Sequence, residues 1–199
     1  LDATDDIKNP IILENSCQQG NELGYTLEEL SQIWNLFPKK YHKRLGFCLD
    51  TCHIYVAGTL QMKDNADVDS FFHKFDELIG LSHLHVIHFN DSKTAFDGHN
   101  DHHNDLLHGY IGNVELGGSP VGLQRIVAWA KKLDVPLIME TPMSEMSCES
   151  AILMVTSWAE NAPPIQLIKK DKVEIAEKGA IVLKKAKELK IKLKAKSTE

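Results

Sequence analysis

The hydrophobic and polar positions of this 199-residue chain repeat one pattern four times. In each repeat, a short apolar run is followed by a polar loop and then by a segment with helical periodicity. The apolar runs are predicted strands, and they cover Pro10–Glu14, Leu45–Asp50, Leu84–His88 and Val135–Glu140. Because strands alternate with helices, the pattern predicts a parallel α/β sheet.

Helix signals follow each predicted strand. Thr26, with Glu29 three residues later, has the capping-box pattern. Apolar side chains recur with a period of 3.6 between residues 68 and 79. Ser119–Pro120 combines an N-cap residue with a proline at the first helical position. We expect one more helix near residues 148–160.

Each predicted strand ends in a polar residue, namely Glu14, Asp50, His88 or Glu140. The carboxyl ends of parallel strands meet at one edge, which is where TIM-barrel active sites lie. The sequence therefore predicts an α/β (β/α)8 TIM-type barrel, of which this chain carries about the last four βα units. A closed barrel needs roughly 250 residues. We therefore expect its amino-terminal half to be missing from this chain or supplied by something else, and the first residue is not Met.

The composition is typical of a globular protein, with 43% hydrophobic and 25% charged residues. It excludes disordered, collagen-like and coiled-coil chains. No apolar run is long enough to span a membrane, and no secretory leader opens the chain. The four cysteines lack paired CxxC spacing, which predicts reduced thiols in an intracellular protein. The choice between nucleus and cytoplasm stays open.

The net charge of −6 divides the chain into two parts. Residues 1–164 carry 11 Lys and Arg against 23 Asp and Glu, a net charge of −12. Residues 165–199 carry 11 against 5, a net charge of +6, and are predicted as a lysine-rich helical tail. That tail could pack on the body, contact nucleic acid or act as a nuclear-targeting signal. The acidic body argues against general attraction of phosphate and favours carboxylates gathered around cations.

Carboxylates and imidazoles gather beside the predicted strand ends. Asp50 precedes His53 by three residues, and a loop rich in His and Asp follows the third strand. Together these groups suit zinc, manganese or iron. Seven candidate ligands exceed the needs of one tetrahedral ion, so we expect a site of two or three ions, which is typical of phosphoryl chemistry. The candidates are Glu14, Asp50, His53, His88, Asp101, His103 and Glu140.

Other histidines and cysteines are predicted to have no role in the site. His83, His85 and His99 are expected to be spectators. Cys48 and Cys52 are expected to be small buried hydrophobic residues. One isolated acid at a strand end would more often be a cap or a surface charge, so only the combination of strand ends and loop indicates a metal site.

Four segments resemble the endonuclease IV family of apurinic/apyrimidinic endonucleases, in the right order and spacing over about residues 10–160. The segments are Leu13–Gly20, Gly46–Gly58, His88–Lys93 with Asp101–His103, and Pro136–Pro142. The resemblance implies a TIM-like barrel with three zinc ions, with manganese as an open alternative. It also implies a monomeric enzyme of base excision repair that hydrolyses the phosphodiester 5′ to an abasic site in duplex DNA.

The resemblance assigns a role to each candidate ligand. Glu14 is the catalytic bridge between the first and second zinc, Asp50, His88 and Glu140 complete the second, and His53, Asp101 and His103 hold the third. The family's other two first-zinc ligands are histidines of the amino-terminal half, and no stretch of this chain matches them. We therefore expect this chain alone to lack a complete first site and much of the DNA contact.

The sequence departs from the family pattern in three loops. His102 stands where the family usually has Arg, and residues 16–20 and 107–112 differ from the usual loop sequences. A sugar isomerase or epimerase of the xylose-isomerase-like superfamily remains an alternative, because it needs only one metal at the four strand ends. The second ligand group in residues 53, 101 and 103 favours the endonuclease. A non-catalytic fragment is the third alternative.

Overall fold

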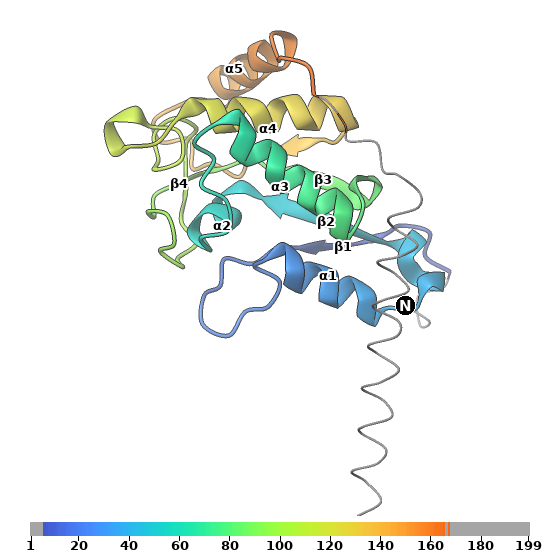
Figure 1. Cartoon of the computed structure of the whole chain (residues 1–199). Coiled ribbons are helices and arrows are strands. Elements are labelled where there is room, and N and C mark those ends of the chain that lie inside the picture. The colour runs from blue at the N-terminus through green and yellow to red at the C-terminus, as the bar shows by residue number, and fades with distance from the viewer. Residues whose placement is uncertain (1–5, 166, 168–199) are drawn as a thin grey trace, which may run out of the picture. The chain divides into compact units, whose positions relative to one another are not determined.

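The structure is a computed structural model, and it describes residues 6–165 and residue 167. Four strand–helix units, β1–α1, β2–α3, β3–α4 and β6–α5, belong to one compact unit (Figure 1). The strands are β1 (Ile11–Glu14), β2 (Leu45–Asp50), β3 (Leu84–His88), β4 (Asp91–Ser92), β5 (His103–Asn104) and β6 (Leu137–Ile138). The α-helices are α1 (Leu27–Leu36), α2 (Thr51–Val56), α3 (Asn65–Leu78), α4 (Pro120–Leu133) and α5 (Cys148–Glu160). Short 3-10 helices cover Lys39–Arg44, Leu81–His83 and Val114–Leu116.

The four-stranded sheet is parallel and has the strand order β1-β2-β3-β6, so its strands follow one another in chain order. The short strands β4 and β5 form a separate pair. The register of the four-stranded sheet places Glu14 opposite Cys48 and Asp50 opposite His88. All four strands therefore end at the same edge. This register brings the polar strand ends to one edge, and the long side chain of Glu14 extends from β1 past β2 to contact His88 at the end of β3.

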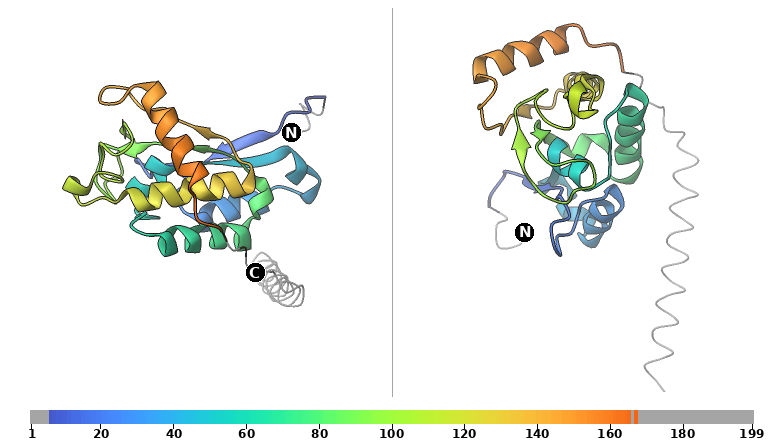
Figure 2. Two further views of the ribbon diagram at one scale, coloured as in Figure 1. Left: turned by 90° about the horizontal axis from the view of Figure 1, so that it is seen from above. Right: turned by 90° about the vertical axis from the view of Figure 1, so that its left-hand side faces the viewer.

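The helices pack on the sheet and on one another in chain order, α1 against α3, α3 against α4, and α4 against α5. Figure 2 shows α1, α3 and α4 following one another around one side of the sheet. Aromatic side chains fill the core between them. Phe47 of β2 meets Phe75 of α3 edge-on, and Phe72 stacks on Trp129 of α4 at a centroid distance of 4.8 Å. The apolar stripe predicted on α3 is the face that is buried.

A buried carboxylate shapes the long loop that follows β3. Asp91 is fully buried, and its side chain accepts backbone N–H groups from Ser92, Leu107, Ile111 and Gly112 at 2.7–3.1 Å. A Cβ atom at residue 109 would collide with this carboxylate, so the glycine there is a steric requirement. The loop folds back as the antiparallel pair β4–β5, which carries His103 toward the sheet edge.

The predicted strands and helices are present, but the first strand begins one residue later than predicted and the last strand is much shorter. The last strand covers only residues 137–138, because Pro136 has no N–H to donate and the N–H of Glu140 donates to the Asn90 side chain. The predicted tail, residues 165–199, lies outside the described residues apart from Ile165 and Leu167. Within the described part, no helix is both long and apolar enough to cross a membrane.

Candidate metal centre

The seven predicted ligands converge at the carboxyl edge of the sheet, and we call them the acid–histidine cluster. Glu14, Asp50 and His88 are the last residues of β1, β2 and β3, and Glu140 lies two residues beyond β6. His53 belongs to the first turn of α2, Asp101 to the loop before β5, and His103 to β5 itself. The cluster therefore collects side chains from segments that are far apart in the chain.

His88, at the end of β3, lies between the carboxylates of Glu14, at the end of β1, and Glu140, just beyond β6. Its Nδ1 atom is 3.1 Å from Glu14 Oε1 and 3.2 Å from Glu140 Oε2. Asp50 Oδ2 is 3.8 Å from the same nitrogen. One imidazole nitrogen thus faces three carboxylates, which is the arrangement of donors around a shared cation.

Helix capping explains why Asp50 and His53 are three residues apart. Asp50 is the N-cap of α2, and its Oδ1 accepts the backbone N–H of His53 at 3.0 Å. An N-cap side chain and the third helical residue lie side by side, so the aspartate fixes the position of the histidine. Asp50 itself is fully buried, and its Oδ2 stays directed at the cluster.

A second group of donors surrounds Asp101. Its Oδ2 lies 3.1 Å from Nε2 of His53, and its Oδ1 lies 3.1 Å from Nε2 of His103. These two contacts are short, but their directions do not suit hydrogen bonds. Among the described residues, the buried Nε2 atoms of His53 and His103 therefore have no hydrogen-bond partner. Both imidazoles are fixed from behind, because Nδ1 of His53 contacts the Asn15 carbonyl at 2.9 Å and Nδ1 of His103 contacts the Glu140 carbonyl at 3.3 Å.

The donor set fits divalent metal ions. Donor atoms of Asp50, His88 and Glu140 lie within 4.8 Å of one another, and so do those of His53, Asp101 and His103. Ligands about 2.0–2.2 Å from a tetrahedral ion lie roughly 3.3–3.6 Å apart, slightly farther than the 3.1 Å separations around Asp101. The unpartnered Nε2 atoms are the atoms that an ion would take, because a buried imidazole nitrogen without a partner is otherwise unfavourable.

Electrostatics around His53 are dominated by the nearby acids. Burial alone would lower the pKa of this imidazole. The charge of Asp50, the hydrogen bond to the Asn15 carbonyl and the charge of Asp101 outweigh the burial, so the pKa of His53 lies above its ordinary value. The cluster therefore has a net attraction for positive charge, which a divalent ion can provide in place of a proton.

Cys48 and Cys52 are also within ligand reach, Cys48 beside Glu14 and His88, and Cys52 beside Asp50 and His103. Burial raises the pKa of both thiols to about 12. The thiolate is the form that binds metal, so the oxygen and imidazole donors are the stronger candidates. This agrees with the interpretation of both cysteines as small buried residues.

Sequence reasoning missed three buried polar residues, two that contact the cluster and one that fixes the loop after Glu140. Asn15 and Asn90 hydrogen-bond to Asp50, at 2.7 and 2.8 Å. Asp105 accepts backbone N–H groups from residues 143, 145 and 146 at 2.6–3.1 Å, and so anchors the loop that follows Glu140. Each of the three stands one or two residues after a predicted ligand, which is the signal that could have identified them.

The histidines predicted as spectators lie elsewhere. The ring of His83 lies against Trp34 at a centroid distance of 4.4 Å. Nε2 of His99 is 3.3 Å from Asp97, and His85 is exposed on β3. None of these contacts involves the acid–histidine cluster.

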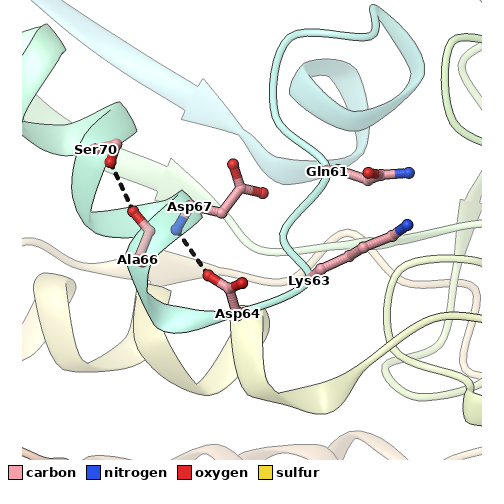
Figure 3. A pocket seen from close by; sticks show the side chains of 6 residues that line it. All are labelled: Gln61, Lys63, Asp64, Ala66, Asp67 and Ser70. Carbon is pink, nitrogen blue, oxygen red and sulfur yellow. Dashed lines mark hydrogen bonds between the residues drawn. The ribbon is translucent and has the colours of Figure 1, made fainter.

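Two cavities differ in the residues that line them. One of about 380 Å³ lies at the start of α3, where Figure 3 shows polar side chains hydrogen-bonded within the same segment, as in the contact of Asp64 with the N–H of Asp67. Asp64 is the N-cap of α3, and Ser70 donates to the Ala66 carbonyl within that helix, so these two polar groups serve the helix itself. The other, of about 250 Å³, is lined by Glu14, Asn15, His53 and Asp101. Of these two cavities, the second opens beside the acid–histidine cluster.

Comparison of the sequence with known proteins indicates the family to which the chain belongs. A family model described as xylose isomerase-like TIM barrel matches residues 1–118. A protein of Acanthamoeba polyphaga mimivirus that is named endonuclease 4 is 37% identical over 140 residues, which is 70% of this chain and 42% of that protein. A protein of the same name from Alkaliphilus oremlandii is 39% identical over 132 residues, which is 66% of this chain and 43% of that protein. The chain spans less than half the length of these relatives.

A solved structure agrees in fold. The crystal structure of endonuclease IV from Thermus thermophilus matches with a TM-score of 0.61 and 28% sequence identity, covering 80% of this chain and 54% of that one. The predicted fold class, a TIM-type barrel of which this chain carries about four βα units, is confirmed by this match, by the family model and by the parallel sheet.

Proposed function

The chain belongs to the xylose isomerase-like TIM barrel family, and from this premise we propose that it contributes to a zinc-dependent DNA repair endonuclease of the endonuclease IV kind. The proposed reaction is hydrolysis of the phosphodiester on the 5′ side of an abasic site in duplex DNA. The names of the similar proteins support this reaction class. The monomeric state and the intracellular location stay predictions.

The observation that carries the proposal is the presence of two donor groups at one sheet edge. Asp50, His88 and Glu140 form one group, and His53, Asp101 and His103 form the other. An isomerase with a single metal would use the first group together with Glu14 and would have no use for the second. The second group therefore favours a multinuclear hydrolase over an isomerase.

The charge of the cluster explains why metal is needed. Four of its seven residues are acids, and within the described chain their ion pairs are with histidines. A phosphodiester would be repelled by these carboxylates alone. When bound, zinc supplies the chemistry of lowering the pKa of water toward 7 and of neutralising phosphate charge.

The chain's own residues would hold and orient the reacting groups. The group around His88 would hold one ion and the group around Asp101 another. Glu14 would bridge toward the first metal position and accept a proton on its carboxylate, which is 36% exposed beside the cavity. This chain has no counterpart of the two further histidines of the first position, so we expect two zinc ions rather than three.

Selectivity for an abasic site does not require contacts between the protein and a DNA base. An abasic nucleotide is already unpaired and partly unstacked, so moving it out of the helix costs less than moving a normal nucleotide. The cavity beside the cluster, about 250 Å³ in volume, offers space next to the donor atoms.

The test combines the metal content of the 199-residue protein with strand cleavage by this protein once the missing amino-terminal half of the barrel is joined to it. After dialysis against zinc, plasma mass spectrometry of the 199-residue protein should give about two zinc ions, and the completed barrel should nick a duplex with one tetrahydrofuran abasic analogue on the 5′ side of the analogue. Asp50→Ala or His53→Ala should abolish cleavage and lower the zinc content. One ion per chain without nicking would support the isomerase, and no bound zinc would support a non-catalytic fragment.

A further inference from the structure

Two buried asparagines lie on either side of Asp50. Asn15 directly follows β1 and is 2% exposed, while Asn90 lies two residues beyond β3 and is fully buried. Neither belongs to the acid–histidine cluster. Burying an amide is unfavourable unless its polar atoms are bonded, so the partners of the Asn90 amide and of Asn15 Oδ1 indicate what these residues do, whereas Asn15 Nδ2 has no partner among the described residues.

Asn90 connects the strands on both sides of β3. Its Nδ2 donates to Asp50 Oδ2 at 2.8 Å, and its Oδ1 accepts the backbone N–H of Glu140 at 2.8 Å. Its own backbone is fixed by the hydroxyl of Thr51, which accepts the Asn90 N–H at 2.8 Å and donates to the Asn90 carbonyl at 2.6 Å. One immobilised side chain therefore sets the positions of two donors of the same metal group.

Asn15 holds the other side of Asp50 and the ring of His53. Its Oδ1 accepts the backbone N–H of Asp50 at 2.7 Å. Its carbonyl lies 2.9 Å from Nδ1 of His53, which places the proton of a neutral ring on that nitrogen. Nε2 is then the lone-pair nitrogen, and within the described residues it has no hydrogen-bond partner.

An amide suits position 90 better than any charged side chain. Its donor end orients the Asp50 carboxylate without cancelling the negative charge that attracts a cation. Its acceptor end meets the N–H of Glu140 at the same time. A carboxylate at this position would keep the second contact, but would face Asp50 with a like charge.

We propose that Asn15 and Asn90 are positioning residues that hold Asp50, His53 and Glu140 in the geometry of a divalent metal site, without binding the metal themselves. The inference rests on the proposed function, because it assigns roles at the same site. Contacts of this kind behind metal ligands typically change metal affinity by roughly 10- to 100-fold.

The test measures zinc affinity of the full chain by competition with a chromophoric chelator. Asn90→Ala removes both contacts, and Asn90→Asp removes only the contact with the Asp50 carboxylate. If charge alone governed affinity, Asn90→Asp would bind zinc more tightly. Positioning instead predicts weaker binding for both variants, by roughly 10- to 100-fold, and an altered visible spectrum of the cobalt-loaded protein. Asn15→Ala should weaken zinc binding in the same direction.

A matched control is Asn113→Asp. It adds the same charge and keeps its acceptor contact with the N–H of Glu115, which is 2.9 Å long and outside the cluster. Its zinc affinity should equal that of the wild type. Circular dichroism in chelator verifies that each variant is folded. Wild-type zinc affinity in folded Asn90→Asp overturns this inference alone, whereas a wild-type chain that binds no zinc overturns the proposed function and this inference together.

Discussion

Two groups of charged side chains in this protein are built in opposite ways. Between α3 and α4, Asp69 accepts from Arg125 through both carboxylate oxygens at 2.7 Å, and Trp129 Nε1 adds a third hydrogen bond at 2.8 Å. Opposite charges meet there in a bidentate pair. We call these three residues the interhelical network.

The acid–histidine cluster has no such compensation within the described chain. Its acids face histidines and one another, and two imidazole nitrogens are buried without a hydrogen-bond partner. The difference indicates that the interhelical network serves the fold, while the cluster keeps donor atoms available for a ligand at some cost in stability. Changes in the two regions should therefore have separable effects.

The largest loss of stability is expected from Trp129→Ala. Trp129 is fully buried, stacks on Phe72 and donates to the interhelical network. Removing so large a side chain should lower the free energy of unfolding by about 3–5 kcal/mol. Urea unfolding in the presence of a chelator measures this loss without any contribution from metal.

A surface substitution provides the control for that experiment. Leu36 is 81% exposed at the end of α1, so Leu36→Ala should change the free energy of unfolding by less than about 0.5 kcal/mol. The folded fraction of Trp129→Ala should still bind the wild-type number of zinc ions. A zinc site lost together with Trp129 would show that the two regions are not separable.

Zinc itself should give an effect of comparable size, and with the opposite sign. A ligand that binds only the folded state stabilises it by about 2.7 kcal/mol per site at a concentration 100 times its dissociation constant. Calorimetry should therefore show a rise in melting temperature with zinc and its reversal by chelator. His103→Ala should remove much of this rise, because it deletes a donor of the group around Asp101.

Asp69→Ala tests the interhelical network directly. It leaves Arg125, only 8% exposed, without its carboxylate partner, and we expect a loss of about 2 kcal/mol in the free energy of unfolding. The stabilisation by zinc should be the same as in the wild type. An altered zinc response in this variant would contradict the separation of the two regions.

The contribution of Asp69 should also depend on pH. Burial would raise its pKa, but the hydrogen bonds from Arg125 and Trp129 outweigh this and hold the pKa below its usual value. The unfolded chain then takes up the proton first as the pH falls. The stability difference between wild type and Asp69→Ala should be constant above about pH 5 and shrink as the pH falls through the lowered pKa.

Much of the fold could be predicted because periodicity is local. The strand Leu45–Asp50 and the helix Cys148–Glu160 have the bounds that their apolar patterns indicate. The last strand was predicted too long, because hydrophobicity does not reveal that the N–H of Glu140 bonds to a side chain from beyond β3. The β4–β5 hairpin depends on backbone amides converging on Asp91, which has no periodic signal.

The candidate site was predictable to a similar degree. Strand-end acids and histidines could be placed at one edge, since parallel register follows from the alternation of strands and helices. Asn15 and Asn90 were missed although each stands one or two residues after a predicted ligand, because an asparagine between a strand and a loop is usually a turn residue. Their role appears only when the register brings both beside Asp50.

The smallest expected change in stability, that of Glu140→Gln, best distinguishes the acid–histidine cluster from the interhelical network. Glu140→Gln removes one charge from a group whose donor atoms lie within 4.8 Å of one another. Repulsion between two carboxylates at such a distance is roughly 1 kcal/mol in a highly solvated setting. In chelator, where no metal offsets this repulsion, the variant should be more stable than the wild type by about 0.5 kcal/mol.

In saturating zinc, the order of stability should reverse, because a neutral amide is a poorer ligand than the Glu140 carboxylate and the variant gains less from the metal. Glu115→Gln, at an exposed acid outside the cluster, should show neither the gain nor the reversal. The crossing of the two curves is the decisive observation, since a residue that serves only the fold would shift stability in the same direction with and without zinc. If Glu140→Gln is destabilising in chelator, the cluster is internally compensated, and the contrast with the interhelical network is wrong.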